Sequence, residues 1–415
     1  MYDLSFTRLV FIIQKKAVAM ALNFIRFIST ILIITFGTHY FLYFSWVRLF
    51  QIAPGHSRNS LFGVLAFLSV TFIISSILIH WTHNTFTKLF YLFSGLWVGL
   101  LGFLIMATVL LWILKGGLVI FASPAAGTTV INGAAILLYT LALIYTGYCH
   151  YQFYTIQIRS IEVPVKNLPL AWENRTIIQL SDLHLGGAKD MNFLDQVVQM
   201  TNSLEGDLIV ITGDLFDGAT GSQEKYIQKL DTLRARHGVM FTSGNHEVYS
   251  GIGISRHLIE QSNITLLDNR ALVLDGLQVL GISYPTFNGN ESFDFNNPEQ
   301  YSKGYPTVLL YHTPTGIKGA NDRLGQVQSS DYLAPDLKFS IAGSNGICLQ
   351  LSGHTHAGQF FPYTWLADKI FKGYHYGLHK NGDMYINISA GTGSWGPPLR
   401  SVHLSEIVVI TLVPR

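Results

Sequence analysis

The sequence predicts two parts of different fold class, an α-helical membrane domain over residues 1–150 and an α/β domain over residues 151–415. Hydrophobic residues make up 49% of the 415-residue chain and charged residues only 13%, well below the roughly 25% of ordinary soluble domains. The charges are also unevenly distributed, because the first part contains a single acidic residue and eight basic ones. In the second part, apolar strand-like runs are each followed by polar side chains.

The second part has the composition of a soluble, acidic domain. It holds 24 of the 25 acidic residues and 19 of the 27 basic ones, a formal charge of −5, and no basic patch indicates a nucleic-acid partner. The two cysteines, Cys149 and Cys348, exclude a disulfide framework. We expect both to be small buried hydrophobic residues.

Four apolar stretches are long enough to cross a bilayer, which requires about 20 apolar residues. Charges lie between these stretches, and several tryptophans fall near their ends, where the membrane interface favours aromatic rings. The expected spans are Phe27–Val47, Leu61–His80, Leu89–Leu114 and Val130–Tyr148. The shorter segment Phe6–Ile13 is expected to be an amphipathic or cytosolic lead-in, because Arg8 interrupts it and no small-residue cleavage site follows.

Basic residues predict the orientation of the spans. Four of them precede the first span, which favours a cytoplasmic N-terminus, and an even number of spans returns the chain to that side. Arg48 and Arg58 in the first connection oppose this orientation, and a different span count would reverse it. We expect an integral protein of the inner (cytoplasmic) membrane with its second domain in the cytoplasm. A transporter has little support, because the spans contain no acidic residue for a proton relay.

After the strand-like segment Tyr154–Val165, apolar β-rich runs alternate with polar periodic segments. The runs expected to form buried strands are Ile177–Leu180, Leu208–Thr212, Val239–Thr242, Thr307–Tyr311, Ile347–Leu351 and Met384–Ile388. The segments expected to form helices are Phe193–Ser203, Glu224–Arg236 and Ile254–Ser262. We expect a long polar loop over residues 282–305 and an irregular stretch over about 317–336.

Five of the predicted strands lead directly into short polar motifs, as happens where α/β proteins assemble functional sites. Each motif alone is ambiguous, since Gly213-Asp214 also suits a turn or a helix N-cap. Together they supply four imidazoles, two carboxylates and one amide, which suit two metal ions about 3.5–4 Å apart. Mixed nitrogen and oxygen ligands favour Mn, Fe or Zn. The candidate ligands are Asp182, His184, Asp214, Asn245, His312, His354 and His356.

The order Asp-x-His, Gly-Asp, Gly-Asn-His-Glu, His, Gly-His-x-His resembles the calcineurin-like metallophosphoesterases. The resemblance covers about residues 153–415 and is closest to the membrane-associated bacterial branch and to vertebrate transmembrane proteins with a metallophosphoesterase domain. Its local motifs are Ser181–Gly186, Gly213–Gly218, Leu351–Gln359 and Gly393–Arg400. It implies a four-layer α/β/β/α sandwich. Three features depart from the family pattern: Ala357 in place of a glycine, Cys348 at an often acidic position, and a long stretch from His312 to Gly353.

The resemblance also implies the role of each candidate site residue. Two divalent metal ions would share Asp214; the first would also bind Asp182, His184 and His356, and the second Asn245, His312 and His354. His246 would face the substrate and protonate the leaving oxygen or stabilise the transition state, with Glu247 orienting it. From the residues themselves, Arg400 is expected to bind a phosphate oxygen, with a structural pair at the surface as the alternative. Asp217 is expected to support a metal-binding histidine, with a turn role as the alternative.

These expectations favour a membrane-anchored, metal-dependent phosphoester or pyrophosphate hydrolase whose substrate is a lipid or a lipid-linked nucleotide. A related alternative is a pyrophosphohydrolase of lipid A synthesis that acts on a UDP-linked acylated sugar. An apolar acyl groove beside Arg400 and residues 282–336 would favour that alternative. A third hypothesis is an inactive membrane sensor or scaffold, which the complete ligand set disfavours.

Overall fold

The computed structural model describes residues 26, 29–82, 84–121, 123–217, 223–285, 293–297, 299–317 and 334–415. The chain forms two compact units, one of residues 1–74 and 97–145 and one of residues 75–96 and 146–415. The second unit therefore includes parts of three apolar helices whose bounds are given below. These parts are the last turns of two of the helices and the first turns of the third. The predicted lead-in Phe6–Ile13 lies outside the described residues, as does much of both predicted polar loops.

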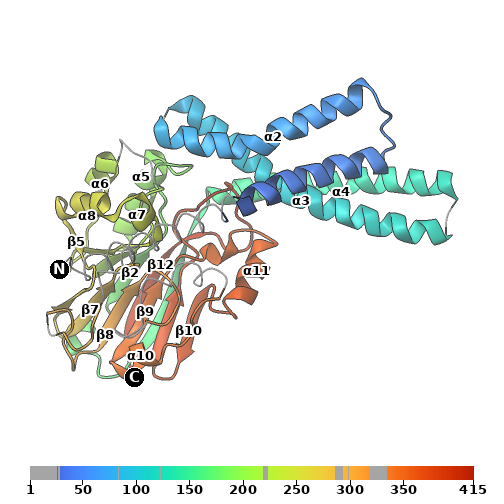
Figure 1. Ribbon diagram of the computed structural model, residues 1–415. Coiled ribbons are helices and arrows are strands. Elements are labelled where there is room, and N and C mark those ends of the chain that lie inside the picture. The colour runs from blue at the N-terminus through green and yellow to red at the C-terminus, as the bar shows by residue number, and fades with distance from the viewer. Residues whose placement is uncertain are drawn as a thin grey trace, which may run out of the picture. The chain divides into compact units, whose positions relative to one another are not determined.

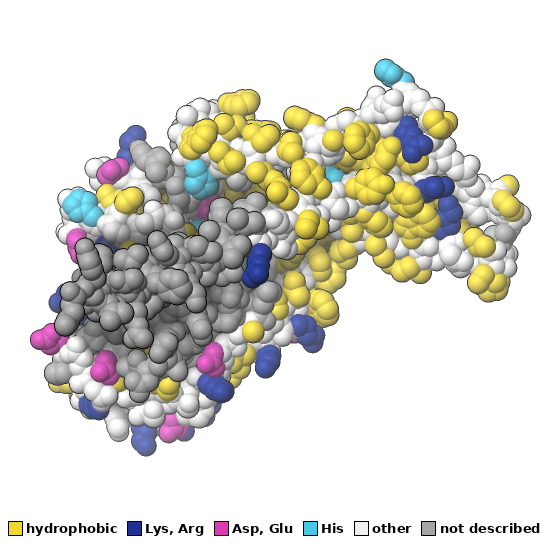
Figure 2. Space-filling model, in the orientation of Figure 1, with side chains coloured by type: hydrophobic (Ala, Val, Ile, Leu, Met, Phe, Trp, Pro, Cys, Tyr) yellow, Lys and Arg dark blue, Asp and Glu magenta, His cyan; other side chains and the backbone are white. Residues whose placement is uncertain are grey.

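Within the described residues, four helices are long and apolar enough to cross a membrane, which confirms the four predicted spans (Figure 1). Each is longer than the sequence predicted or shifted by a few residues. Hydrophobic side chains gather on the visible face of these helices in Figure 2, as expected of surfaces that face lipid. The helices are Ser29–Leu49, α2 (His56–Trp81), α3 (Thr85–Phe121) and α4 (Pro124–Phe153).

Polar side chains within the first unit pair with one another between helices. The Trp97 indole donates to His39 Nε2 at 2.9 Å, and the Trp46 indole donates to the Tyr139 hydroxyl at 2.8 Å. Such pairing satisfies groups that lipid cannot hydrogen-bond. His39 therefore has a hydrogen-bond partner on another helix of the same unit.

The second unit contains two six-stranded sheets, ordered β1-β12-β2-β3-β4-β5 and β10-β11-β9-β8-β7-β6. The strands of the first sheet are β1 (Ile156–Val165), β2 (Thr176–Leu180), β3 (Leu208–Thr212), β4 (Val239–Thr242), β5 (Ile264–Leu266) and β12 (Ser405–Pro414). Those of the second are β6 (Arg270–Leu274), β7 (Leu277–Ile282), β8 (Thr307–Tyr311), β9 (Ile347–Ser352), β10 (Gly377–Asn381) and β11 (Met384–Ile388). Strands β2 to β5 are parallel, as are β7, β8, β9 and β11.

Three hydrophobic cores define the layers of this unit. One core lies between the sheets and includes Val210, Val308 and Leu351. A second packs the first sheet against α5 (Met191–Ser203), α6 (Gln223–Leu230) and α8 (Ile252–Glu260). The third covers the other sheet and includes α10 (Ser340–Ser344). The order helix, sheet, sheet, helix confirms the predicted α/β/β/α sandwich (Figure 1).

The predicted strands agree with the structure to within two residues, but the predicted helix Glu224–Arg236 is wrong at its end. The helix α6 ends at Leu230. Beyond it, the side chain of Asn202 donates to the Thr232 carbonyl at 2.9 Å and accepts from the Arg234 amide at 2.8 Å. These long-range bonds hold the following residues in turns, so the helical pattern of the sequence does not continue as a helix.

Candidate metal centre

The structure brings all seven candidate ligands together at the carboxyl ends of five strands. Because β2, β3 and β4 are parallel neighbours, as are β8 and β9, the loops that follow them leave the same edge of each sheet. The first three loops deliver Asp182 and His184, Asp214, and Asn245; the other two deliver His312, and His354 with His356. All seven side chains are buried.

Five of the seven candidate ligands have a left-handed backbone. Asp182, His184, Asp214, His354 and His356 have φ values between 46° and 70°. A non-glycine residue rarely adopts this conformation, which costs about 1–2 kcal/mol. Such residues cluster at functional sites, where the surrounding structure holds them in place. Here they turn the chain sharply after each strand, so that ligands from separate loops meet.

Glu247 holds the loop of Asp214 in this strained form. Its buried carboxylate accepts hydrogen bonds from the backbone amides of Asp214 at 2.9 Å, Leu215 at 2.8 Å and Gly244 at 2.7 Å. It thereby ties the loop after β3 to the loop after β4. These contacts are to the backbone, so the orientation of the His246 ring by Glu247 remains a prediction.

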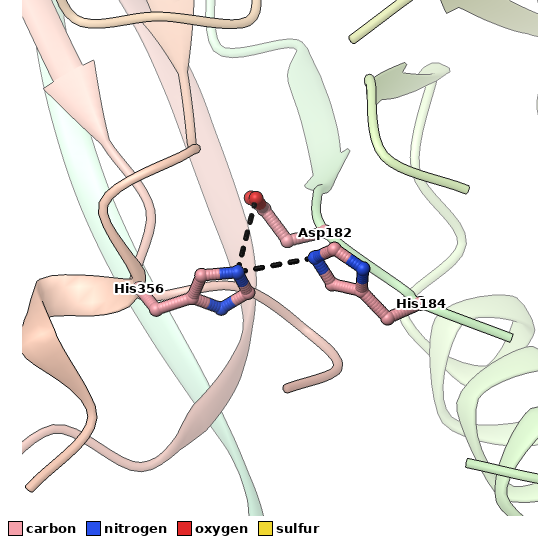
Figure 3. A group of neighbouring side chains, drawn as sticks. All are labelled: Asp182, His184 and His356. Carbon is pink, nitrogen blue, oxygen red and sulfur yellow. Dashed lines mark hydrogen bonds and ion pairs between the residues drawn. The ribbon is translucent and has the colours of Figure 1, made fainter. Parts of the chain in front are cut away.

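The first group of ligands is formed by Asp182, His184 and His356 (Figure 3). The Nε2 atoms of the two histidines lie 3.1 Å apart, and His356 Nε2 lies 3.6 Å from Asp182 Oδ1. Asp214 Oδ2 approaches the same group, 3.7 Å from His184 Nε2. These are the four residues predicted for the first metal ion.

The second group contains Asp214, His312 and His354, joined by Asn245. His312 Nε2 lies 3.2 Å from Asp214 Oδ2 and 3.2 Å from His354 Nδ1. The amide oxygen of Asn245 lies 3.0 Å from His312 Nε2 and 2.8 Å from His354 Nδ1. Asp214 Oδ2 therefore lies close to ligand atoms of both groups, as a bridging carboxylate would.

The residues present fit divalent metal ions. Nitrogen and oxygen ligands about 2.0–2.2 Å from one ion lie roughly 3 Å or a little more from one another, similar to the separations in both groups. Burial lowers the pKa of His354 to about 3 and the pKa values of His184 and His356 well below the usual range. These imidazoles are therefore neutral near pH 7 and present lone pairs, the form that binds a metal.

His246 is the most exposed of the predicted site residues and lies beside both groups. Its Nε2 lies 4.0 Å from Asp214 Oδ2, and its Nδ1 lies 3.5 Å from Asp217 Oδ1. Its ring meets that of His184 edge to face, with centroids 4.6 Å apart. Asp217 Oδ1 also lies 3.9 Å from His184 Nδ1, so Asp217 faces two site histidines. Burial raises the pKa of the Asp217 carboxyl, opposed by the charge of His246.

Arg400 is completely buried, which favours a structural role over direct binding of phosphate. Its guanidinium donates to the Ser394 hydroxyl at 2.7 Å and to the carbonyls of Ala390 and Gly393, each at 2.7 Å. A further bond reaches the carbonyl of His403 at 2.9 Å. Arg400 thus fixes the loop between β11 and β12, and its contact with a substrate remains a prediction.

Sequence reasoning assigned no role to several residues that shape the site. The Ser181 hydroxyl donates to Asp182 Oδ2 at 2.5 Å, and the Trp395 ring lies 5.8 Å from that of His246. Both residues belong to motifs on which the family resemblance rests, and this membership was the sequence feature that could have identified them. Ala357, which stands where a glycine was expected, is buried with a left-handed φ of 51°.

Replacement of Gly353 by alanine is predicted to impair the first metal group. A Cβ atom there would lie 2.0 Å from Asp182 Oδ2 and 2.0 Å from the Ser181 hydroxyl, so Asp182 must move. We expect Gly353→Ala to lose about one metal ion per chain, measured by elemental analysis of purified protein. Gly343→Ala is the matched control, because its Cβ would meet nothing within 4 Å. Unchanged metal content in Gly353→Ala would contradict the assignment of Asp182.

Metal affinity is predicted to fall as the pH drops below about 6. Burial raises the pKa of Asp182 to about 6, so below that pH a metal ion must displace its proton. This group alone should weaken binding about tenfold per pH unit. Calorimetric titration with Mn²⁺ at several pH values would show this slope in the wild type and its absence in Asp182→Asn. Parallel curves for the two proteins would count against the prediction.

Part of the chain is similar to known proteins. Residues 175–358 match the family model described as calcineurin-like phosphoesterase. An uncharacterized metallophosphoesterase of Helicobacter pylori is 32% identical over 243 residues, which cover 58% of this chain and 60% of that protein. The Bos taurus transmembrane protein with metallophosphoesterase domain is 29% identical over 272 residues, which cover 61% of this chain and 56% of that protein.

Among solved structures, a dimetal phosphatase from Danio rerio is similar with 13% identity and a TM-score of 0.33, covering 58% of this chain and 93% of that chain. The chain spans between 56% and 60% of the length of the two relatives from Bos taurus and Helicobacter pylori. The matched region contains the strands and loops that deliver the seven candidate ligands. Residues 175–358 therefore match the calcineurin-like phosphoesterases, and this region follows four apolar helices of the described residues in the sequence.

Proposed function

We propose that this protein is a membrane-anchored hydrolase that uses two divalent metal ions to cleave a phosphoester or phosphoanhydride bond. The observation that carries the proposal is the pair of ligand groups that meet at Asp214, with His246 beside them and partly exposed. The nitrogen and oxygen ligands favour Mn, Fe or Zn. When bound, such a pair of ions supplies charge that orients a phosphate and activates water.

The chain's own residues supply the remaining chemistry. His246 Nε2 is placed to donate a proton or hydrogen bond to the leaving oxygen of a phosphate held beside Asp214. Asp217 Oδ1 lies 3.5 Å from Nδ1 on the other side of the ring and supports a role in positioning the His246 ring. Asn245 contributes an oxygen without further negative charge, which limits the repulsion that an anionic substrate would meet.

The four apolar helices support a substrate that the membrane supplies, such as a lipid or lipid-linked nucleotide. We further propose that the protein lies in the inner membrane with its catalytic domain in the cytoplasm, on the basis of the basic residues before the first span. For the UDP-linked acylated sugar, the groove expected beside Arg400 and residues 282–336 would fall partly on residues outside the described ranges. Phosphomonoesters, diesters, pyrophosphates and lipids tested on detergent-purified protein would separate these substrate classes.

Asp214→Asn is predicted to abolish hydrolysis, because it removes the carboxylate shared by both ligand groups. His246→Asn is predicted to keep its metal content and lose about 10²–10⁴-fold in kcat, the usual contribution of a proton donor. Turnover of a p-nitrophenyl phosphodiester together with metal content would measure both effects. Asp383→Asn is the control, because Asp383 is exposed and pairs with Arg415 rather than with a site residue. Equal turnover in wild type and Asp214→Asn would instead favour the inactive sensor or scaffold.

A further inference from the structure

An exposed aromatic surface lies next to the candidate metal centre. None of the eight residues of α11 (Tyr363–Ile370), all of them described, is buried. Trp365 on this helix is 58% exposed, and Trp395 on the loop before β12 is 52% exposed. We call the group of exposed large hydrophobic residues on these two segments the aromatic rim. It consists of Phe361, Tyr363, Trp365, Leu366, Trp395 and Val402.

Hydrogen bonds join the two segments of the aromatic rim to each other and to the site. The side chain of Gln359 donates to the Trp395 carbonyl at 2.9 Å and accepts from the Trp395 amide at 3.0 Å. The Gln359 carbonyl accepts from the Ser401 amide at 3.0 Å. Gln359 follows the loop that carries His356, and the Trp395 ring lies beside that of His246. The aromatic rim therefore borders the side of the site where His246 is exposed.

The same loop is bonded to the last turns of α4, which belong to the second compact unit. The Arg400 amide donates to the Cys149 carbonyl at 2.9 Å, and His150 Nδ1 donates to the Pro398 carbonyl at 3.0 Å. The end of α4 is also fixed by Lys189, whose ammonium donates to the Phe153 carbonyl at 2.7 Å. Because α4 is a candidate span, we take its end as the expected point where the chain leaves the membrane.

The composition of the aromatic rim matches a membrane interface. Tryptophan and tyrosine concentrate where an apolar environment meets water, and basic residues close by favour anionic headgroups. Lys369 in the last turn of α11 and Lys372 just beyond it are both exposed or partly exposed. Exposed apolar surfaces of this kind mark interaction sites. Because this domain is attached to candidate membrane spans, the bilayer is available as the partner.

We propose that the aromatic rim inserts into the headgroup region of the bilayer that holds the spans. This contact would fix the open side of the metal centre at the membrane surface, where phosphate groups of lipids are presented. The insertion itself is independent of the reaction; only its effect on lipid turnover rests on the proposed function.

Depth-dependent fluorescence quenching on the full chain tests the insertion. A bimane label at Trp365→Cys, with Cys149→Ala and Cys348→Ser, would be measured in nanodiscs of phosphatidylcholine and phosphatidylglycerol that hold one chain each. Asp383→Cys is the control, since Asp383 pairs with Arg415 beyond the end of β12 that is remote from the site. The ten-residue strand separates the two ends by about 30 Å.

We expect a lipid with a headgroup-proximal nitroxide to quench the label at position 365 severalfold more than the label at position 383. Equal quenching at both positions would overturn the proposal. Protection of position 365 that appears only when two chains share a disc would also overturn it, because a second copy would then be the partner. The result stands whether or not the protein hydrolyses any phosphoester.

Catalysis provides a second readout. Trp365→Ser combined with Leu366→Ser should lower kcat/KM for a phospholipid in vesicles by at least about tenfold, while turnover of a soluble p-nitrophenyl phosphodiester is unchanged. An equal fall on both substrates would indicate structural damage and contradict a role in membrane contact. Wild-type protein that hydrolyses neither substrate would refute the proposed function, while the quenching result would still decide the insertion.

Discussion

The left-handed backbone of the loops after β2, β3 and β9 is the constraint on which the site depends. Five ligand residues adopt this costly conformation, and without it the loops would continue away from one another. The two sheets offset the cost, because their buried core fixes where each strand ends. Glu247 adds three backbone hydrogen bonds at the loop of Asp214. The packed core and these hydrogen bonds thus hold the loops in a strained backbone conformation that brings the candidate ligands together.

The same constraint separates the residues that would hold metal from those that would meet a substrate. The candidate ligands are buried, whereas His246 lies near the start of the helix Asn245–Ser250 after β4 and is partly exposed. The loop between β11 and β12 lies beside them, fixed by the buried guanidinium of Arg400. That loop also carries Trp395 and is hydrogen-bonded to the end of α4, a candidate membrane span.

Much of this arrangement could be predicted from the sequence, because it rests on local patterns. Apolar runs followed by Asp, Asn or His predicted the five strands that lead into the site and the seven candidate ligands that the structure brings together. Features that depend on residues far apart in the sequence were not predicted. The early end of α6 depends on Asn202, and the backbone contacts of Glu247 depend on the meeting of two loops. Arg400 was expected at the substrate, but its burial follows from carbonyls brought together only by folding.

Titration of the metal-free protein with Mn²⁺ or Zn²⁺, with phosphodiester turnover followed in the same samples, tests the central claim most directly. The account predicts that two ions bind per chain and that turnover appears only as the second is bound, because the two ligand groups share Asp214. Full turnover with one ion per chain, or turnover that persists in the metal-free protein, would contradict it.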